Sequence, residues 1–345
     1  MNYCGIDIGG TLSYIYLTDK EGRKKKAGYV DTSATALEEA LKPFLRSGLS
    51  VAIEAGNQTA WIHDKLKGLG AKVWVVNPAK VRLIAESRQK TDKVDAKVLC
   101  ELLRIKGLPR PVHMPGRETR SLRGLLAARR QLVRARVKLN NVVRGLLRQE
   151  GIRLQAGCLK SPVGWQRLMS RTLVGSHWEV VLEAYFQSFL HLTRAIRQLE
   201  KELAKAEKSD ERARRLRTIP GVGWVSALTF LSAVDKIQRF PSSRKLVGYS
   251  GLAPTVRESS ERTEYGPITR EGRKEIRGTW VEAAHRVVTQ RTTEAKPLQR
   301  WYWKVAKRRG NKTAIVALTR KLLTVAYQML KSGTDYDPAR IGRAA

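Results

Sequence analysis

Apolar and polar positions alternate in a regular order over the first hundred residues. Short apolar or alternating runs bounded by turn residues predict five β-strands, at 3–8, 13–18, 28–30, 49–53 and 72–76. Apolar residues at helical spacing predict four helices, at 36–45, 57–66, 78–85 and from Asp92 onward. The chain therefore opens with three strands that would form an antiparallel meander, and then alternates helix and strand.

That order is the pattern of a ribonuclease-H-like α/β fold. The predicted domain covers residues 1–108, because Gly107-Leu108-Pro109-Arg110-Pro111 has the composition of a linker. The rest of the chain is predicted to be mostly helical.

Four carboxylates occupy positions that this fold would bring together. Asp7 ends the first strand and Glu54 ends the fourth, while Asp92 and Asp95 lie three apart on one helix face. Taken singly, each has a plainer explanation as a turn, loop or solvated helix-start residue. Taken together, they predict a site for Mg²⁺ or Mn²⁺, since hard divalent cations prefer carboxylate oxygens.

Two long helices follow the linker and define a predicted coiled-coil and dimerisation region at 109–210. Leucines recur every seven residues in the first helix, with small apolar residues three further on, as Leu125, Leu132, Leu139, Leu146, Ala128, Ala135 and Val142. Residues 177–208 carry a second apolar stripe. These helices would pair within one chain or between chains, and a helical domain at 211–333 and a mobile tail at 334–345 would follow.

The charge of the chain changes the functional picture. There are 66 Lys and Arg against 31 Asp and Glu, a formal net charge of +35. Such an excess favours a polyanionic partner, with nucleic acid ahead of an anionic membrane, because no run of about 18 apolar residues exists. Four arginines of the first long helix are predicted phosphate contacts, and the alternative is an ordinary solvated face: Arg129, Arg130, Arg134 and Arg136.

Two segments of the last domain carry further candidates. Ile219-Pro220-Gly221-Val222-Gly223 before an apolar helix predicts a helix-hairpin-helix element, in which the Gly221 and Gly223 region would offer backbone N–H groups to a phosphate. Such hairpins also serve purely in packing. Residues 298–309 mix aromatic and basic residues, which permits base stacking, although Trp301 and Trp303 would serve equally as core anchors.

Cysteine use and the amino terminus bear on the compartment. Cys4, Cys100 and Cys158 form neither a zinc pattern nor a disulfide framework, and the N-terminus has no signal-peptide character. A cytoplasmic, nucleoid-associated protein is expected.

Several motifs in order along the chain resemble the DEDD-type insertion-sequence transposases, relatives of the Piv-type DNA invertases. They are Gly5-Ile6-Asp7, Ile53-Glu54-Ala55, Asn77-Pro78, Lys90-Thr91-Asp92-Lys93-Val94-Asp95-Ala96, Ile219-Pro220-Gly221-Val222-Gly223, Gly251-Leu252-Ala253-Pro254 and Ile268-Thr269-Arg270-Glu271-Gly272.

This resemblance implies a RuvC-like N-terminal domain whose metal-binding quartet is Asp7, Glu54, Asp92 and Asp95. It also implies a nucleophilic serine after the Gly-Leu-x-Pro motif, on Ser259, with Ser260 as the neighbouring alternative. Both serines lie in residues 255–262, which the sequence pattern predicts to be a polar loop. Arg257 and Arg262 would offer charge to the scissile phosphate. The implied partners are a structured non-coding bridge RNA and donor and target double-stranded DNA, in a dimer that assembles to a tetramer.

Two other functions remain open from the residues alone. One is a Holliday-junction-type nuclease in which the quartet activates water and Ser259 is incidental. The other is a non-catalytic nucleic-acid-binding protein whose carboxylates are structural.

Overall fold

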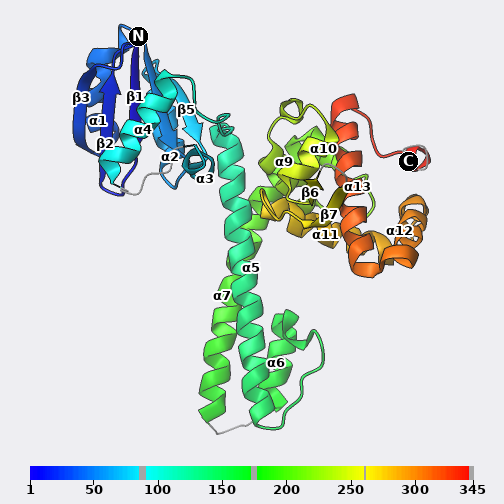
Figure 1. Ribbon diagram of the computed structural model, residues 1–345. Coiled ribbons are helices and arrows are strands. Elements are labelled where there is room, and N and C mark those ends of the chain that lie inside the picture. Colours follow the sequence, from blue (N-terminus) through cyan, green and yellow to red (C-terminus); the bar gives the residue numbers. More distant parts are fainter. Residues whose placement is uncertain (85–90, 172–176, 260–261, 342–345) are drawn as a thin grey trace. The chain divides into compact units, whose positions relative to one another are not determined.

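The computed structural model of the chain describes residues 1–84, 91–171, 177–259 and 262–341 (Figure 1). It forms two compact units, Met1–Pro115 and Gly116–Ala345. The first unit is an α/β domain and the second is almost entirely helical.

A five-stranded mixed sheet forms the centre of the first unit, in the order β3-β2-β1-β4-β5. Its strands are β1 (Asn2–Asp7), β2 (Leu12–Thr18), β3 (Lys24–Asp31), β4 (Leu49–Glu54) and β5 (Lys72–Val76). β1 runs antiparallel to β2 and parallel to β4. This meander followed by parallel strands confirms the predicted ribonuclease-H-like arrangement.

Helices cover both faces of this sheet. On one face, α1 (Ala34–Leu45) and α2 (Thr59–Gly68) bury Leu37 and Ile62 against alternate residues of β1 and β4 such as Ile6. The other face receives α4 (Asp92–Arg104), which lies across β1, β2 and β4 (Figure 1). The short α3 (Pro78–Arg82) follows β5.

Gly5 sets how closely α4 approaches β1. A Cβ at Gly5 would lie 2.0 Å from the Ala96 carbonyl oxygen and 2.6 Å from the Cys100 nitrogen. Only glycine permits that approach, so one turn of α4 lies directly on the strand. This contact fixes α4 over the strand that ends at Asp7.

Two 33-residue helices, α5 (Arg117–Gln149) and α7 (His177–Ser209), pack together within one chain. The predicted heptad seam was wrong at its three smaller apolar positions, because Ala128, Ala135 and Val142 are exposed, and its four leucines are only half-buried. The buried positions are instead Leu126, Val143 and Leu147. Helix α5 contacts α9 as well as α7, and a straight helix of 3.6 residues per turn turns its buried stripe away from a strict seven-residue repeat.

The stretch after α5 contains a helix that the sequence pattern did not predict, α6 (Pro162–Arg171). Trp165 of α6 is fully buried and stacks on Phe186 of α7, with ring centroids 5.8 Å apart. This small aromatic cluster closes one end of the α5–α7 pair.

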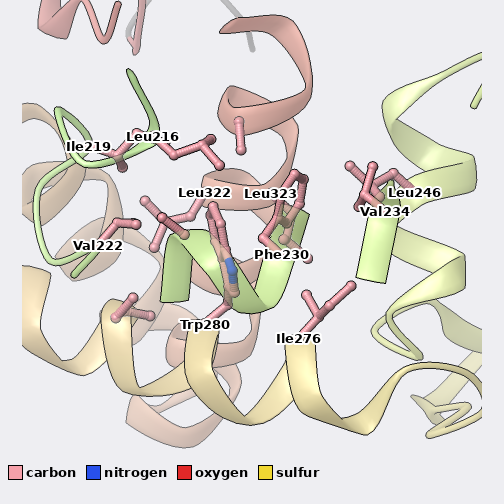
Figure 2. Close-up of a cluster of buried hydrophobic side chains, with 14 of the residues drawn as sticks. Leu216, Ile219, Val222, Phe230, Val234, Leu246, Ile276, Trp280, Leu322 and Leu323 are labelled. Atoms are coloured by element: carbon pink, nitrogen blue, oxygen red, sulfur yellow. The ribbon is translucent and has the colours of Figure 1, made fainter. Parts of the chain in front are cut away.

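The remaining helices form a bundle around one apolar core, part of which Figure 2 shows. Their bounds are α8 (Glu211–Leu216), α9 (Trp224–Val234), α10 (Ser243–Tyr249), α11 (Lys274–Thr289), α12 (Lys296–Arg309) and α13 (Asn311–Ser332). Trp280 of α11 and Phe230 of α9 meet at its centre, with ring centroids 5.0 Å apart. A two-stranded sheet joins β6 (Pro254–Ser259) and β7 (Arg262–Ile268).

Arginines bind the last carbonyl groups of α9. Arg123 donates to the Ser232 and Ala233 oxygens over 2.6 and 3.1 Å. Arg239 donates to the Val234 oxygen and Arg212 to the Asp235 oxygen, over 2.7 and 3.1 Å. Cations at a helix C-terminus satisfy carbonyls that lack an intrahelical partner and match the helix dipole.

Residues 334–341 pack on the bundle, although a mobile tail was predicted. The Tyr336 N–H donates to the Thr218 hydroxyl over 3.0 Å, and the Tyr336 hydroxyl donates to the Glu294 carbonyl over 3.1 Å. Ile341 is buried in the same core.

Candidate catalytic site and nucleic-acid interface

Strand register places a row of polar side chains across one face of the N-terminal sheet. Tyr29 pairs with Tyr14, and Tyr14 pairs with Asp7, on β3, β2 and β1. Ile6 pairs with Ile53 in the parallel β1–β4 ladder, so the next residues, Asp7 and Glu54, end adjacent strands side by side. Side chains at paired positions point to the same face, and adjacent strands are about 4.8 Å apart.

That face is the one covered by α4. Gly5, two residues before Asp7, lies under Ala96 of α4, and Ala52, two residues before Glu54, packs with Leu99. Residues two apart on a strand share a face. Asp7 and Glu54 therefore point toward the side on which α4 lies.

Asp92 and Asp95 lie in the first turn of α4. Thr91 caps the helix, with its side chain accepting the Val94 N–H over 3.4 Å. An N-cap threonine and acidic residues in the first turn stabilise a helix start. The local sequence thus favours a helix that begins at the two aspartates.

Tyr29 connects the start of α4 to the row on the sheet. Its hydroxyl donates to Oδ2 of Asp92 over 3.4 Å, and its ring meets Tyr14 edge-to-face at 4.9 Å. Partial burial, then the Asp92 carboxylate, and more weakly Tyr14 and Asp7, raise the pKa of Tyr29. The Tyr29 hydroxyl is therefore close enough to both Asp92 and Asp7 for their negative charges to raise its pKa. Sequence reasoning missed Tyr29, because only strand register shows that it shares a row with Asp7.

Asp7 and Glu54 end adjacent strands on the face that α4 covers, and Asp92 and Asp95 lie in the first turn of that helix. Within the described ranges, no group of three or more His, Cys, Asp or Glu side chains is placed to hold a metal ion. Tyr29 is two strands from Asp7, roughly 10 Å away, so Asp92 is held toward β3. The donor set itself, four carboxylates, matches the ligands that Mg²⁺ and Mn²⁺ prefer.

Ser259 lies on a β-hairpin where a polar loop was predicted. It is the last residue of β6, and its backbone pairs with Arg262, the first residue of β7. Arg257 pairs with Glu264 on the exposed hairpin, whereas Ser260 falls outside the described residues. The prediction of a loop was wrong because two short exposed strands need no apolar alternation, and polar residues satisfied by a ladder look the same as loop residues.

Three of the four arginines predicted on α5 have partners within the chain. Arg129 is 2.6 Å from Glu200 and lies over the Trp224 ring at 5.1 Å. Arg130 is 3.7 Å from Glu275, and Arg136 donates to the Thr193 hydroxyl over 3.4 Å. Arg134 is exposed, and it forms no ion pair with any residue in the described part of the chain. Phosphate contact stays a prediction for all four, and Arg134 is the most accessible.

Gly221 and Gly223 have different environments in the turn between α8 and α9. Gly221 has φ +79°, and a Cβ there would lie 2.4 Å from the Ala283 carbonyl of α11. Gly223 begins α9 without a side-chain cap, beside a cavity of about 580 Å³ that Arg217 and Arg286 help to line. Gly221 therefore serves packing, and Gly223 leaves open helix N–H groups for a ligand.

Comparison with known proteins identifies this combination. The family model described as "Transposase IS116/IS110/IS902 family" matches residues 213–300 of this chain. A second family model, for the DEDD transposase domain of the IS110 type, matches residues 4–151. The transposase for insertion sequence element IS1111A of Coxiella burnetii is 27% identical over 96% of this chain and 87% of its own. The transposase for element IS1328 of Yersinia enterocolitica is 25% identical over 96% and 97%.

The chain belongs to the IS110/IS116/IS902 family of transposases. It is also similar to the pilin gene-inverting protein of Moraxella bovis, at 28% identity over 77% of this chain and 74% of that protein.

The two matched ranges of this IS110-family transposase contain the features described above. Residues 4–151 include all four carboxylates, and residues 213–300 include the glycine turn and the Ser259 hairpin. The chain is thus a DNA transposition enzyme with a DEDD domain. Among the described residues of this transposase, no helix is long and apolar enough to cross a bilayer.

Proposed function

We propose that this IS110-family transposase is an RNA-guided DNA recombinase, in which the carboxylate row works with a serine nucleophile. The observation that carries the proposal is the register of β1 and β4, which sets Asp7 beside Glu54 under the helix that begins at Asp92 and Asp95. Such a row at the ends of parallel strands is where α/β folds position their chemistry.

The N-terminal unit would act as the RuvC-like part of the enzyme. Asp7, Glu54, Asp92 and Asp95 would hold Mg²⁺ or Mn²⁺, which when bound would stabilise charge on the attacking and leaving oxygens of a phosphodiester. Tyr29 would keep Asp92 oriented through its hydroxyl.

Ser259 would provide the nucleophile from the hairpin. Its hydroxyl loses a proton as the Oγ–P bond forms, and the P–O3′ bond breaks to leave a 3′-hydroxyl that takes up a proton. The DNA then carries a 5′-phosphoserine link, and attack by another 3′-hydroxyl reverses the step and frees the serine. The phosphodiester bond count is conserved, so exchange needs no external energy source. Arg257 and Arg262 would neutralise the phosphate.

Guidance by a structured RNA and assembly of dimers to a tetramer complete the proposal. The net charge of +35 favours large polyanions, and Arg134 and the Gly223 helix start are open to phosphates. The α5–α7 pair would contribute to the subunit contacts. Carboxylates and serine lie in separate compact units, which suits a site completed between subunits.

The test follows the DNA product. Wild-type protein with its RNA and Mg²⁺ should form a covalent protein–DNA adduct, detected by denaturing gel after nuclease trimming. Ser259→Ala and Asp92→Asn should each bind RNA and DNA normally and form no adduct, while a mixture of the two should regain some activity if sites are shared.

Three outcomes would overturn parts of the proposal. Cleavage without any adduct would favour the water-using nuclease. An adduct with Ser259→Ala that disappears with Ser260→Ala would move the nucleophile to Ser260. Unchanged cleavage by Asp92→Asn would remove the metal site.

A further inference from the structure

Helix α12 presents a dense positive charge to solvent. It has six basic residues and no acidic residue among its 14, and all six are exposed, as Lys296, Arg300, Lys304, Lys307, Arg308 and Arg309. None of the six forms an ion pair with the described residues. The cations of α12 therefore remain available to an outside anion.

Trp303 lies in the middle of this charge, and its environment decides between the two roles left open for it. Its side chain is 55% exposed, which excludes a role as a core anchor. Trp301, by contrast, is half-buried and lies against the core, with the Lys321 ammonium 5.3 Å from its ring centroid. Trp301 therefore packs against the core, whereas Trp303 on the same helix faces solvent.

The neighbouring ring of Tyr302 holds the Trp303 ring in place. Tyr302 is 4% exposed and packs in the core, and its ring meets Trp303 edge-to-face with centroids 4.9 Å apart. An edge contact with a fixed neighbour limits the rotation of an exposed ring and leaves a face free. A hollow of about 410 Å³ adjoins Trp303, lined by it with Lys296, Gln299 and Arg300.

Spacing along the helix sets the cations around the ring. Lys296, Arg300, Trp303 and Lys307 follow one another at intervals of four, three and four residues, so they share one face of α12. An aromatic face flanked by phosphate-binding cations is the arrangement used to bind unpaired nucleotides, where the base stacks and the backbone is neutralised. Self-association through this face is disfavoured, because it would bring like charges together.

We propose that this α12 face (Lys296, Arg300, Trp303 and Lys307) binds an unpaired nucleotide of RNA by stacking its base on Trp303. Duplex DNA keeps its base faces stacked inside the helix, whereas loops and bulges of structured RNA expose theirs. The inference rests on the proposed RNA partner, and it names the surface that would bind one unpaired nucleotide of that RNA. Trp303 and Lys307 lie beyond residue 300, where the family match ends.

The experiment compares single-stranded and duplex probes on the full chain. Binding of a labelled oligouridylate, of an oligothymidylate of the same length, and of a duplex RNA with the same number of phosphates is measured by fluorescence anisotropy over a salt series. Trp303→Ala should weaken oligouridylate binding about tenfold, the loss expected for one base–aromatic stack, and leave duplex binding unchanged. Trp303→Phe should restore most of it, and Trp301→Phe serves as the matched control with unchanged binding.

The charge partners give an independent arm. Arg300→Gln with Lys307→Gln should weaken both probes and reduce the salt slope by about 0.7 per cation removed for the single strand. Thermal unfolding should match wild type for all variants on this exposed face.

Three results would overturn the inference: oligouridylate binding by Trp303→Ala equal to wild type, equal losses for single strand and duplex, or a loss confined to an oligothymidylate probe. Wild-type protein that binds DNA but no RNA would instead overturn the proposed RNA partner. Wild-type protein that binds RNA, with Trp303→Ala binding it equally, would remove only the α12 face.

Discussion

The Tyr29 hydroxyl reaches Asp92 across 3.4 Å, and this bond joins β3 at the edge of the sheet to the first residue of α4. Through this hydrogen bond, the position of Tyr29 on β3 orients the Asp92 side chain at the start of α4, the helix that carries two of the four carboxylates. Because Tyr29 is 52% exposed, the bond faces solvent and contributes little to folding.

Tyr29→Phe should therefore leave thermal unfolding almost unchanged and lower the rate of strand cleavage about tenfold, as loss of a hydrogen bond that orients a metal-ligating carboxylate does. Mn²⁺ affinity, measured by electron paramagnetic resonance, should fall in parallel. Tyr14→Phe is the matched control, since its hydroxyl makes no hydrogen bond to Asp92. Equal cleavage and Mn²⁺ binding by Tyr29→Phe and wild type would contradict an orienting role.

Gly5→Ala should destabilise the N-terminal unit, because the new Cβ would meet the Ala96 carbonyl at 2.0 Å and force α4 from β1. We expect a cost of about 1–3 kcal/mol, the usual range for overpacking, seen in urea unfolding. Gly28→Ala is the control on β3, where the added Cβ meets nothing within 4 Å. A Gly5→Ala protein as stable as Gly28→Ala would show that α4 is free to shift.

Arg129→Gln and Arg134→Gln should separate packing from phosphate contact on α5. Arg129 loses its Glu200 partner and its place over Trp224, so unfolding should occur at lower denaturant. Arg134 is exposed, so its loss should leave stability unchanged and reduce the salt slope of nucleic-acid binding by about 0.7–0.9. The reverse pattern would mean that Arg129 is the phosphate contact.

Gly221→Ala and Gly223→Ala should likewise separate packing from phosphate contact in the turn between α8 and α9. The first variant introduces a Cβ at positive φ, 2.4 Å from the Ala283 carbonyl, and should lower the unfolding temperature clearly. The second adds a Cβ that meets only Arg286, at 3.8 Å, and should be near neutral for stability. If Gly223→Ala also leaves DNA and RNA binding unchanged, the helix start does not bind phosphate.

Asp19 predicts a pH dependence within the N-terminal unit. Desolvation tends to raise the pKa of Asp19, but hydrogen bonds from Arg23 and the charges of Arg23 and Lys25 lower it to about 2. Its stabilising contribution should thus be present above the ordinary value of 3.8 and be lost as the pH falls toward 2. Asp19→Asn should flatten the stability profile over that window in urea unfolding, and an unchanged profile would contradict the assignment.

The sequence predicted the N-terminal fold well, because strands buried by helices on both faces leave strong apolar runs. Asp7 and Glu54 were singled out as candidates because they end such runs. Tyr29 was not, since it lies on a strand whose other residues are mostly exposed and charged. Its role depends on pairing between strands, which no local pattern records.

The second unit was harder to predict for two physical reasons. The Ser259 hairpin is stabilised by ladder hydrogen bonds between polar residues, so it has no apolar signature. On α5, Arg129 and Arg136 are half-buried and have partners on α7, which the charge pattern that predicted phosphate contacts for them did not show. A long arginine side chain covers apolar surface while its charged end finds a partner, which hides it from pattern analysis.

The arginines at the end of α9 show that not all of the positive charge of this chain is available to an anionic partner. Arg123, Arg212 and Arg239 direct their guanidinium groups at four consecutive carbonyls, so part of the +35 formal charge is structural. A lysine-for-arginine recoding would keep the formal net charge at pH 7 and lose the forked contact of Arg123, because an ammonium group does not hold two carbonyls in one fixed plane as a guanidinium does. Net charge alone therefore does not determine this part of the architecture: two chains of equal formal charge would attract a polyanion equally, and only one would retain the arginine contacts at the end of α9.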